Sequence, residues 1–180
     1  ELYRKSISSI LSHTRLSSVI KIRSIITWTG FWFVLLQASR AATYLGKNEP
    51  VLIIDCGFPK TKIRRESNRC LDRMLDNISV AANLCAQQQL KSKDLNKLRG
   101  FFTSTAATIG LLNAFKGKRH FKINDEKSDL IEALVLASTK PEEEIPVENF
   151  VHNILFKKFK LVIGRGAAED SGLLSNINGS

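Results

Sequence analysis

The stretch SIITWTGFWFVLLQAS, residues 24–39, contains no charged side chain and is the most unusual segment of this chain. Arg23 and Arg40 flank this run, which holds both tryptophans and two of the ten phenylalanines. A helix that crosses a membrane needs about 20 mostly apolar residues, and residues 41–44 extend the run toward that length if Arg40 snorkels. An uncharged run of this length also suits a buried core helix. The sequence leaves both interpretations open.

A second uncharged run, GFFTSTAATIGLLNAF, occupies residues 100–115. It is rich in glycine, serine and alanine, and such small residues let two helices approach closely in a membrane or in a soluble protein. Lys116, Lys118 and Arg119 close the run. If both runs enter a membrane, the aromatic side chains that insert are Trp28, Phe31, Trp32, Phe33, Phe101 and Phe102.

Amphipathic spacing predicts further helices around the two runs. Apolar residues recur at three- and four-residue steps in the segments 7–22, 69–86, 129–138 and 147–159. Ser92 suits the N-cap of a helix that leads into the second run. Short apolar runs at 51–54 and 160–164 allow one or two short strands, and residues beyond Gly166 are expected to be loose. We therefore predict a mainly α fold, a bundle of five to six helices with at most one or two short strands.

The charge of the chain is strongly basic and unevenly distributed. Lys and Arg number 27 and Asp and Glu 17, a net charge of +10. We divide the chain into a basic helical region, residues 1–120, which holds both uncharged runs, and a mildly acidic helical extension, residues 121–180. A basic surface attracts polyanions, either nucleic acid or the anionic face of a membrane. The predicted contacts are Arg23, Arg40, Lys60, Lys62, Arg64, Arg65, Arg69, Lys116, Lys118 and Arg119.

No catalytic, cofactor or metal site can be assembled from the sequence. The three cysteines and three histidines form neither C-x-x-C nor H-x-x-x-H spacing. Asp55 follows an apolar run, but a turn at Asp-Cys-Gly explains it equally well. Gly164-Arg-Gly166 has the first two glycines of a dinucleotide-binding turn, whereas Glu169 stands in place of the third. An enzyme is the third interpretation, behind two binding functions, and we expect no cofactor.

The order of several motifs resembles a known family. The matching residues are Trp28, Trp32, Asp76, Val80, Asn83, Leu84, Gly100, Thr103, Ser104 and Gly110. Between residues 23 and 115 the chain resembles the C-terminal half of the peroxin-eleven family, the peroxisomal membrane-elongation proteins. Members of that family end just after the second run, whereas this chain continues to residue 180.

The resemblance implies a non-enzymatic protein of the peroxisomal membrane that remodels bilayers and self-associates as a homo-oligomer. Its basic groups would lie against an anionic membrane surface, where each contributes about 1 kcal/mol. The alternative is a soluble, basic α-helical domain that binds nucleic acid or a protein partner, with both uncharged runs in its core. The N-terminus has no secretory layout, so in either case we expect an intracellular protein.

Overall fold

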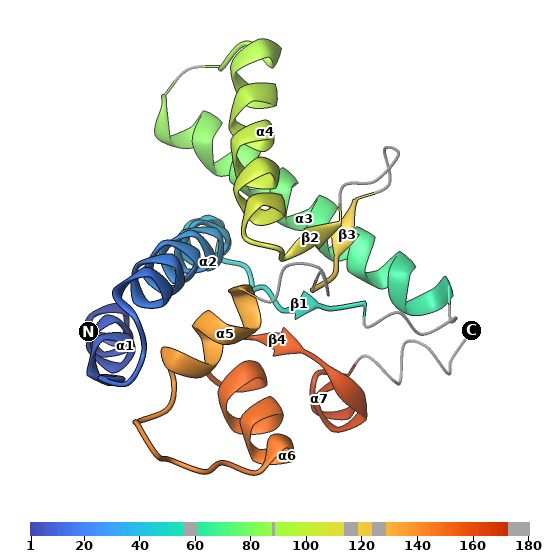
Figure 1. Cartoon of the computed structure of the whole chain (residues 1–180). Coiled ribbons are helices and arrows are strands. Elements are labelled where there is room, and N and C mark those ends of the chain that lie inside the picture. Colours follow the sequence, from blue (N-terminus) through green and yellow to red (C-terminus); the bar gives the residue numbers. More distant parts are fainter. Residues whose placement is uncertain (56–60, 88, 114–118, 124–128, 173–180) are drawn as a thin grey trace.

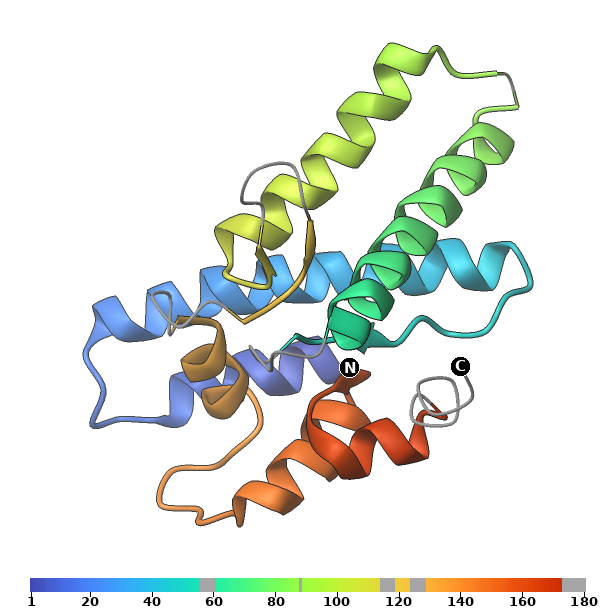
Figure 2. The ribbon, with the colours of Figure 1, turned by 90° about the vertical axis from the view of Figure 1, so that its right-hand side faces the viewer.

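Helix α2 (Ser18–Tyr44) contains the whole first uncharged run and is the central element of the fold. The computed structural model describes residues 1–55, 61–87, 89–113, 119–123 and 129–172. The fold is mainly α, as predicted, with α1 (Leu2–Ser12), α3 (Thr61–Cys85), α4 (Ser92–Thr108) and α5 (Asp129–Leu136) packed against α2 (Figures 1 and 2).

Helix α1 (Leu2–Ser12) lies antiparallel to the first half of α2. Tyr3 Oη and Thr29 Oγ1 are 2.9 Å apart, and Lys21 Nζ donates to the Leu11 carbonyl at 3.4 Å. The prediction of one helix over residues 7–22 is wrong, because the chain turns back after Ser12. Ser17 caps the new helix by accepting a hydrogen bond from the Ile20 N–H.

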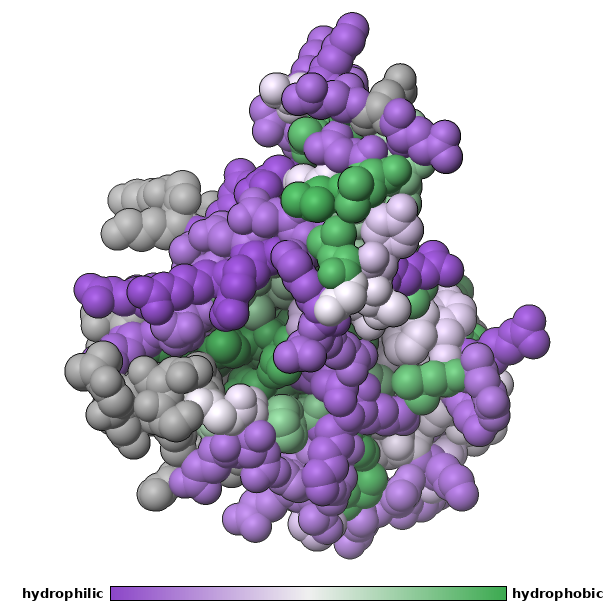
Figure 3. Space-filling view, turned by 180° about the vertical axis from the view of Figure 1, so that it is seen from behind, coloured by the Kyte–Doolittle hydropathy of each residue, from purple (hydrophilic) through white to green (hydrophobic). Residues whose placement is uncertain are grey.

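Helices α3 (Thr61–Cys85) and α4 (Ser92–Thr108) form a hairpin whose far end projects from the body (Figures 1 and 2). Arg99 Nη1 of α4 lies 2.7 Å from Asp76 Oδ1 of α3 and ties the two helices together. Seen from behind, hydrophilic side chains cover most of the surface, and apolar patches interrupt them, one on this hairpin (Figure 3). Helix α3 begins at Thr61, earlier than the predicted start at residue 69.

The second uncharged run forms more than a helix, which corrects the expectation of a single apolar helix over 100–115. Helix α4 ends at Thr108, and Gly110 adopts φ +79°, a left-handed conformation that glycine adopts without strain. The Leu111 N–H donates back to the Ala106 carbonyl at 2.9 Å. Strand β2 (Leu112–Asn113) follows directly. Ser92 is the first residue of α4, and Lys91 takes the N-cap position predicted for it.

Four short strands form two pairs. Strand β1 (Leu52–Ile53) runs parallel to β4 (Leu161–Val162), in the segments where the sequence predicted short strands. Strand β2 pairs antiparallel with β3 (His120–Phe121), which the sequence did not predict. The Asp55 N–H donates to the Phe121 carbonyl at 2.9 Å and joins the two pairs.

The last third of the chain packs on one side of α2. Helix α5 (Asp129–Leu136) lies at the predicted 129–138 segment. The predicted helix 147–159 begins as α6 (Val147–Asn149) and continues as the π-helix η2 (Phe150–Phe156). Helix α7 (Gly164–Asp170) corrects the expectation of loose chain for residues 167–170. The rest of that prediction, residues 173–180, lies outside the described residues.

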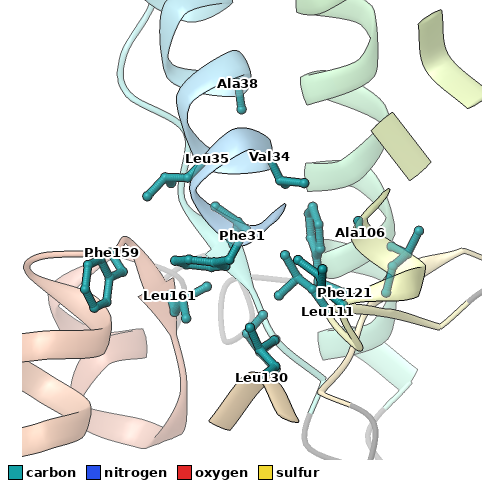
Figure 4. Packing of buried hydrophobic residues seen from close by; sticks show 14 of the residues in the cluster. Phe31, Val34, Leu35, Ala38, Ala106, Leu111, Phe121, Leu130, Phe159 and Leu161 are labelled. Atoms are coloured by element: carbon teal, nitrogen blue, oxygen red, sulfur yellow. The ribbon is translucent and has the colours of Figure 1, made fainter. Parts of the chain in front are cut away.

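One hydrophobic core joins the basic region and the acidic extension. Trp28 and Phe31 of α2 are 0% exposed, and their rings lie 5.2 and 5.8 Å from the ring of Phe159. In Figure 4, Phe31 lies among Leu161 of β4, Leu130 of α5, Phe121 of β3 and Leu111, which directly precedes β2. The largest buried side chains of residues 1–120 therefore pack directly against those of residues 121–180.

Candidate functional site

A buried carboxylate lies just beyond β1. The Asp55 side chain is 1% exposed, Arg64 Nε donates to its Oδ2 at 3.0 Å, and His120 Nε2 lies 3.3 Å from the same oxygen. The Ser67 hydroxyl donates to the Phe121 carbonyl at 3.1 Å and holds β3 against α3. The end of β1, the start of α3 and strand β3 thus assemble an Asp55–Arg64–His120 cluster.

His120 is held as a neutral imidazole at this cluster. Burial lowers its pKa, and the positive charges of Arg64 and Lys122 lower it further, whereas the charge of Asp55 opposes the shift. His120 Nε2 and Asp55 Oδ2 lie 3.3 Å apart, and this contact favours the protonated imidazole against the larger effect of burial. The cluster is therefore a charge contact between Asp55 and Arg64 with an imidazole beside it.

This cluster makes stability fall in acid. Because the folded pKa of His120 lies below the unfolded value of about 6.5, the unfolded chain binds the proton more readily, and stability declines as the pH falls below that value. Urea unfolding over a pH series measures this decline. We expect His120→Gln to reduce the slope. Equal slopes in the two proteins would contradict the assignment to His120.

The cluster lacks the further groups of a nucleophilic site within the part of the chain that the structure describes. Ser67 donates its proton to a backbone carbonyl, and burial raises the pKa of the Cys70 thiol, which lies 2.7 Å from the Val51 carbonyl. Cys56 lies outside the described residues. Nor do the described side chains contain a group of three His, Cys, Asp or Glu placed to hold a metal.

The predicted basic stretch at the start of α3 divides between the interior and the surface. Arg64 turns inward to Asp55, whereas Lys62, Arg65 and Arg69 are exposed. Exposed Arg73 continues the same face at helical spacing. We call Lys62, Arg65, Arg69 and Arg73 the basic stripe; at 1.5 Å per residue its four Cα positions extend over about 16 Å.

The face of the basic stripe also carries acidic residues: Glu66, and exposed Asp72 and Asp76, which follow Arg69 and Arg73 by three residues, with Asp76 paired to Arg99. A further cation lies nearby. Glu66 Oε1 lies 2.5 Å from Arg69 Nη1 and partly neutralises it. Exposed Arg119 lies beside α3, because Asn68 Nδ2 donates to its carbonyl at 2.6 Å. The stripe therefore keeps a net positive charge on one side of α3.

The remaining predicted cations do not gather in one place. Arg23 lies 3.3 Å from Asp129 Oδ1 and 3.1 Å from Glu132 Oε2, so α5 neutralises it. Arg40 is exposed near the other end of α2, far along the helix from Arg23. Three further predicted contacts lie outside the described residues: Lys60, Lys116 and Lys118.

The aromatic residues predicted to insert into a membrane take three kinds of position. Half of them are buried in the protein core: Trp28, Phe31 and Phe102. Trp32 and Phe33 are half-buried, and Phe101 is 60% exposed, with its ring 5.5 Å from that of Phe33. Contacts with protein thus account for most of these side chains.

Helix α2 also has an uncovered apolar face. Val19, Ile22 and Ile26 share one side of the helix and are 74%, 57% and 66% exposed. Within the described part of the chain, α2 alone is long and apolar enough to cross a membrane, with a mean hydropathy of 1.5 over its best window. A buried core helix passes the same test.

Sequence reasoning missed two members of these sites for different reasons. Arg73 follows Arg69 by four residues, so helical spacing alone could have added it to the basic stripe. His120 stands beside Asp55 because β3 pairs with β2 and its Phe121 carbonyl accepts from Asp55 and Ser67, and nothing local in the sequence signals these contacts.

Comparison of the chain with protein-family models, with curated proteins and with solved structures returned no match.

Proposed function

We propose that this chain is a non-enzymatic, basic helical domain that binds the nucleic-acid backbone through the basic stripe of α3. The observation that carries the proposal is the alignment of Lys62, Arg65, Arg69 and Arg73 on one exposed helix face. Lys and Arg that neutralise phosphates release condensed counterions, and this release drives sequence-independent binding.

The chemistry of the basic stripe favours phosphate contacts over base contacts. Arginine presents a planar fork of donors that matches phosphate oxygens, and three of the four stripe residues are arginines. No aromatic residue lies between the stripe residues in the sequence, so base stacking has no support there. Phosphate contacts position a protein on nucleic acid without reading its sequence.

The core packing of α2 favours this function over insertion of the uncharged runs. Trp28 and Phe31 fill the interior between α2 and the acidic extension, and neither is exposed. Placing these side chains among lipid tails would require the core to open. A soluble domain leaves the core closed and the basic stripe on the surface.

Neutralising the basic stripe is expected to abolish binding. Fluorescence anisotropy with labelled single- and double-stranded oligonucleotides, over a salt series, measures the effect. Four phosphate contacts predict a slope of about −3.6 in log K against log salt for duplex DNA. The variant with Lys62, Arg65, Arg69 and Arg73 replaced by Gln should bring that slope close to zero.

A charge-matched control separates the stripe from net charge. Lys91, Lys93, Lys97 and Lys157 are exposed and lie away from the stripe face, on α4, its N-cap and the end of η2. Replacing these four by Gln removes the same charge and should leave most of the binding. An equal loss in both variants would show that only the overall charge of the chain matters.

A second candidate function is membrane association, including the remodelling of the peroxisomal membrane and the self-association that the family resemblance implies. The uncovered face formed by Val19, Ile22 and Ile26, on a helix of membrane-crossing length, supports it. Flotation with anionic liposomes tests it. Resistance to both salt and alkaline carbonate washes would favour insertion, whereas release by salt would leave only the basic surface as the contact. The double variant with Ile22→Glu and Ile26→Glu tests this face. If it floats with the liposomes as well as the unaltered chain does, the Val19–Ile22–Ile26 face does not contact the membrane.

A further inference from the structure

We infer that the pocket at the carboxyl ends of β1 and β4 binds a small aliphatic carboxylate, with its chain among apolar side chains and its headgroup on Lys122. The pocket has a volume of about 360 Å³. This volume lies near the lower end of the range for small-molecule sites, so the ligand is small.

The position of the pocket is typical of ligand sites. Ile54 and Asp55 follow β1, and Ile163 follows β4, so both parallel strands end at its wall. The π-helix η2 forms another wall, and π-helical turns occur often at functional sites.

The walls are mostly apolar. Leu134 of α5 and Leu155 of η2 are buried at the inner side, and Ile131 and Val147 are 48% and 77% exposed. Phe150 and Val151 of η2 also line the pocket, and their degree of burial is intermediate. A hydrocarbon chain that enters past the exposed residues exchanges water for these side chains, which is favourable in proportion to the apolar area covered.

The charges of the pocket select an anionic headgroup. Asp55 is already bound by Arg64 at 3.0 Å, so its negative charge is compensated within the protein. Among the described lining residues Lys122 is the other ionisable one, and within the described ranges it forms no ion pair. Its backbone N–H donates to the Leu111 carbonyl at 3.1 Å, which fixes the backbone position of this lining residue. The carboxylate of a bound ligand would form an ion pair with the Lys122 ammonium group and neutralise its charge.

Isothermal titration calorimetry with octanoate, 1-octanol and octylammonium tests the inference, because the three probes share one chain length and differ in headgroup charge. We expect octanoate to bind most tightly and octylammonium most weakly. In the series from hexanoate to octanoate, each added CH₂ should tighten binding about fourfold. Anionic phospholipid vesicles should not displace octanoate, which separates a free carboxylate from a lipid headgroup.

Two variants separate the headgroup from the chain. Lys122→Gln should weaken the binding of octanoate about tenfold or more and leave the binding of octanol unchanged. Lys122→Arg should restore octanoate binding. Val151→Phe should weaken the binding of both ligands, because the larger side chain fills the pocket. Circular dichroism of this variant checks that the fold is retained. Lys157→Gln, at an exposed lysine that does not line the pocket, is the matched control.

Three results would overturn the inference. The first is an absence of binding heat for octanoate just below its critical micelle concentration. The second is octylammonium binding as tightly as octanoate. The third is octanoate binding that Lys122→Gln leaves unchanged.

Discussion

Replacing Trp28 by alanine is expected to lower the free energy of unfolding by about 3–5 kcal/mol. Trp28 is 0% exposed, and its ring lies 5.7 Å from that of Phe31 and 5.2 Å from that of Phe159. Truncation leaves a cavity between α2 and the acidic extension. Chemical denaturation followed by far-ultraviolet circular dichroism measures the loss.

Two further variants show whether the loss comes from core packing. Trp28→Phe should cost much less than alanine, because the ring volume is largely kept and the indole N–H has no hydrogen-bond partner among the described residues. Ile26→Ala, at a 66% exposed position of the same helix, should change stability by less than about 0.5 kcal/mol. If Trp28→Ala and Ile26→Ala lower the free energy of unfolding equally, α2 is not the core helix in solution. That result would support the membrane interpretation.

Replacing Arg64 by methionine is expected to cost about 1–3 kcal/mol. The change leaves the 1% exposed Asp55 carboxylate without its guanidinium partner at 3.0 Å. Breaking a fully buried ion pair costs about 3–5 kcal/mol, but the Arg64 side chain is 57% exposed, so solvent screening reduces the effect. Urea unfolding of the purified variants measures it.

The adjacent residue provides the control for this prediction. Arg65→Met removes the same charge from an exposed position of the basic stripe and should cost less than about 0.5 kcal/mol. In a double-mutant cycle, Asp55→Asn should offset part of the Arg64→Met loss, because no unpaired carboxylate then remains. If the two losses simply add, the pair does not contribute to stability and the site needs another explanation.

The helices were predictable where their apolar residues keep one period. The uncharged run 24–39 lies within α2, and the stripe through Leu71, Leu75 and Ile78 lies on the buried side of α3. These positions follow from local spacing alone, since residues three and four apart meet on the same helix face. The basic character of the start of α3 was equally visible.

The features that sequence spacing missed depend on residues far apart in the chain. The turn after Ser12 places Tyr3 against Thr29, and apolar periodicity continues through that turn without a break. The end of α4 at Thr108 and the turn at Gly110 lead directly into β2, which pairs with β3. Local propensity is a weak guide where tertiary contacts choose the conformation.

Composition and periodicity are local properties, and they were enough to predict a basic, mainly helical chain with an uncharged apolar helix. Long-range packing was needed to place Trp28 and Phe31 inside the protein, to turn Arg64 toward Asp55 while Arg65 faces outward, and to bring Lys122 beside an apolar pocket. An apolar helix lowers its free energy by covering its surface with either protein or lipid. The choice between the two depends on which other segments are present to cover it, and that is a property of the whole fold.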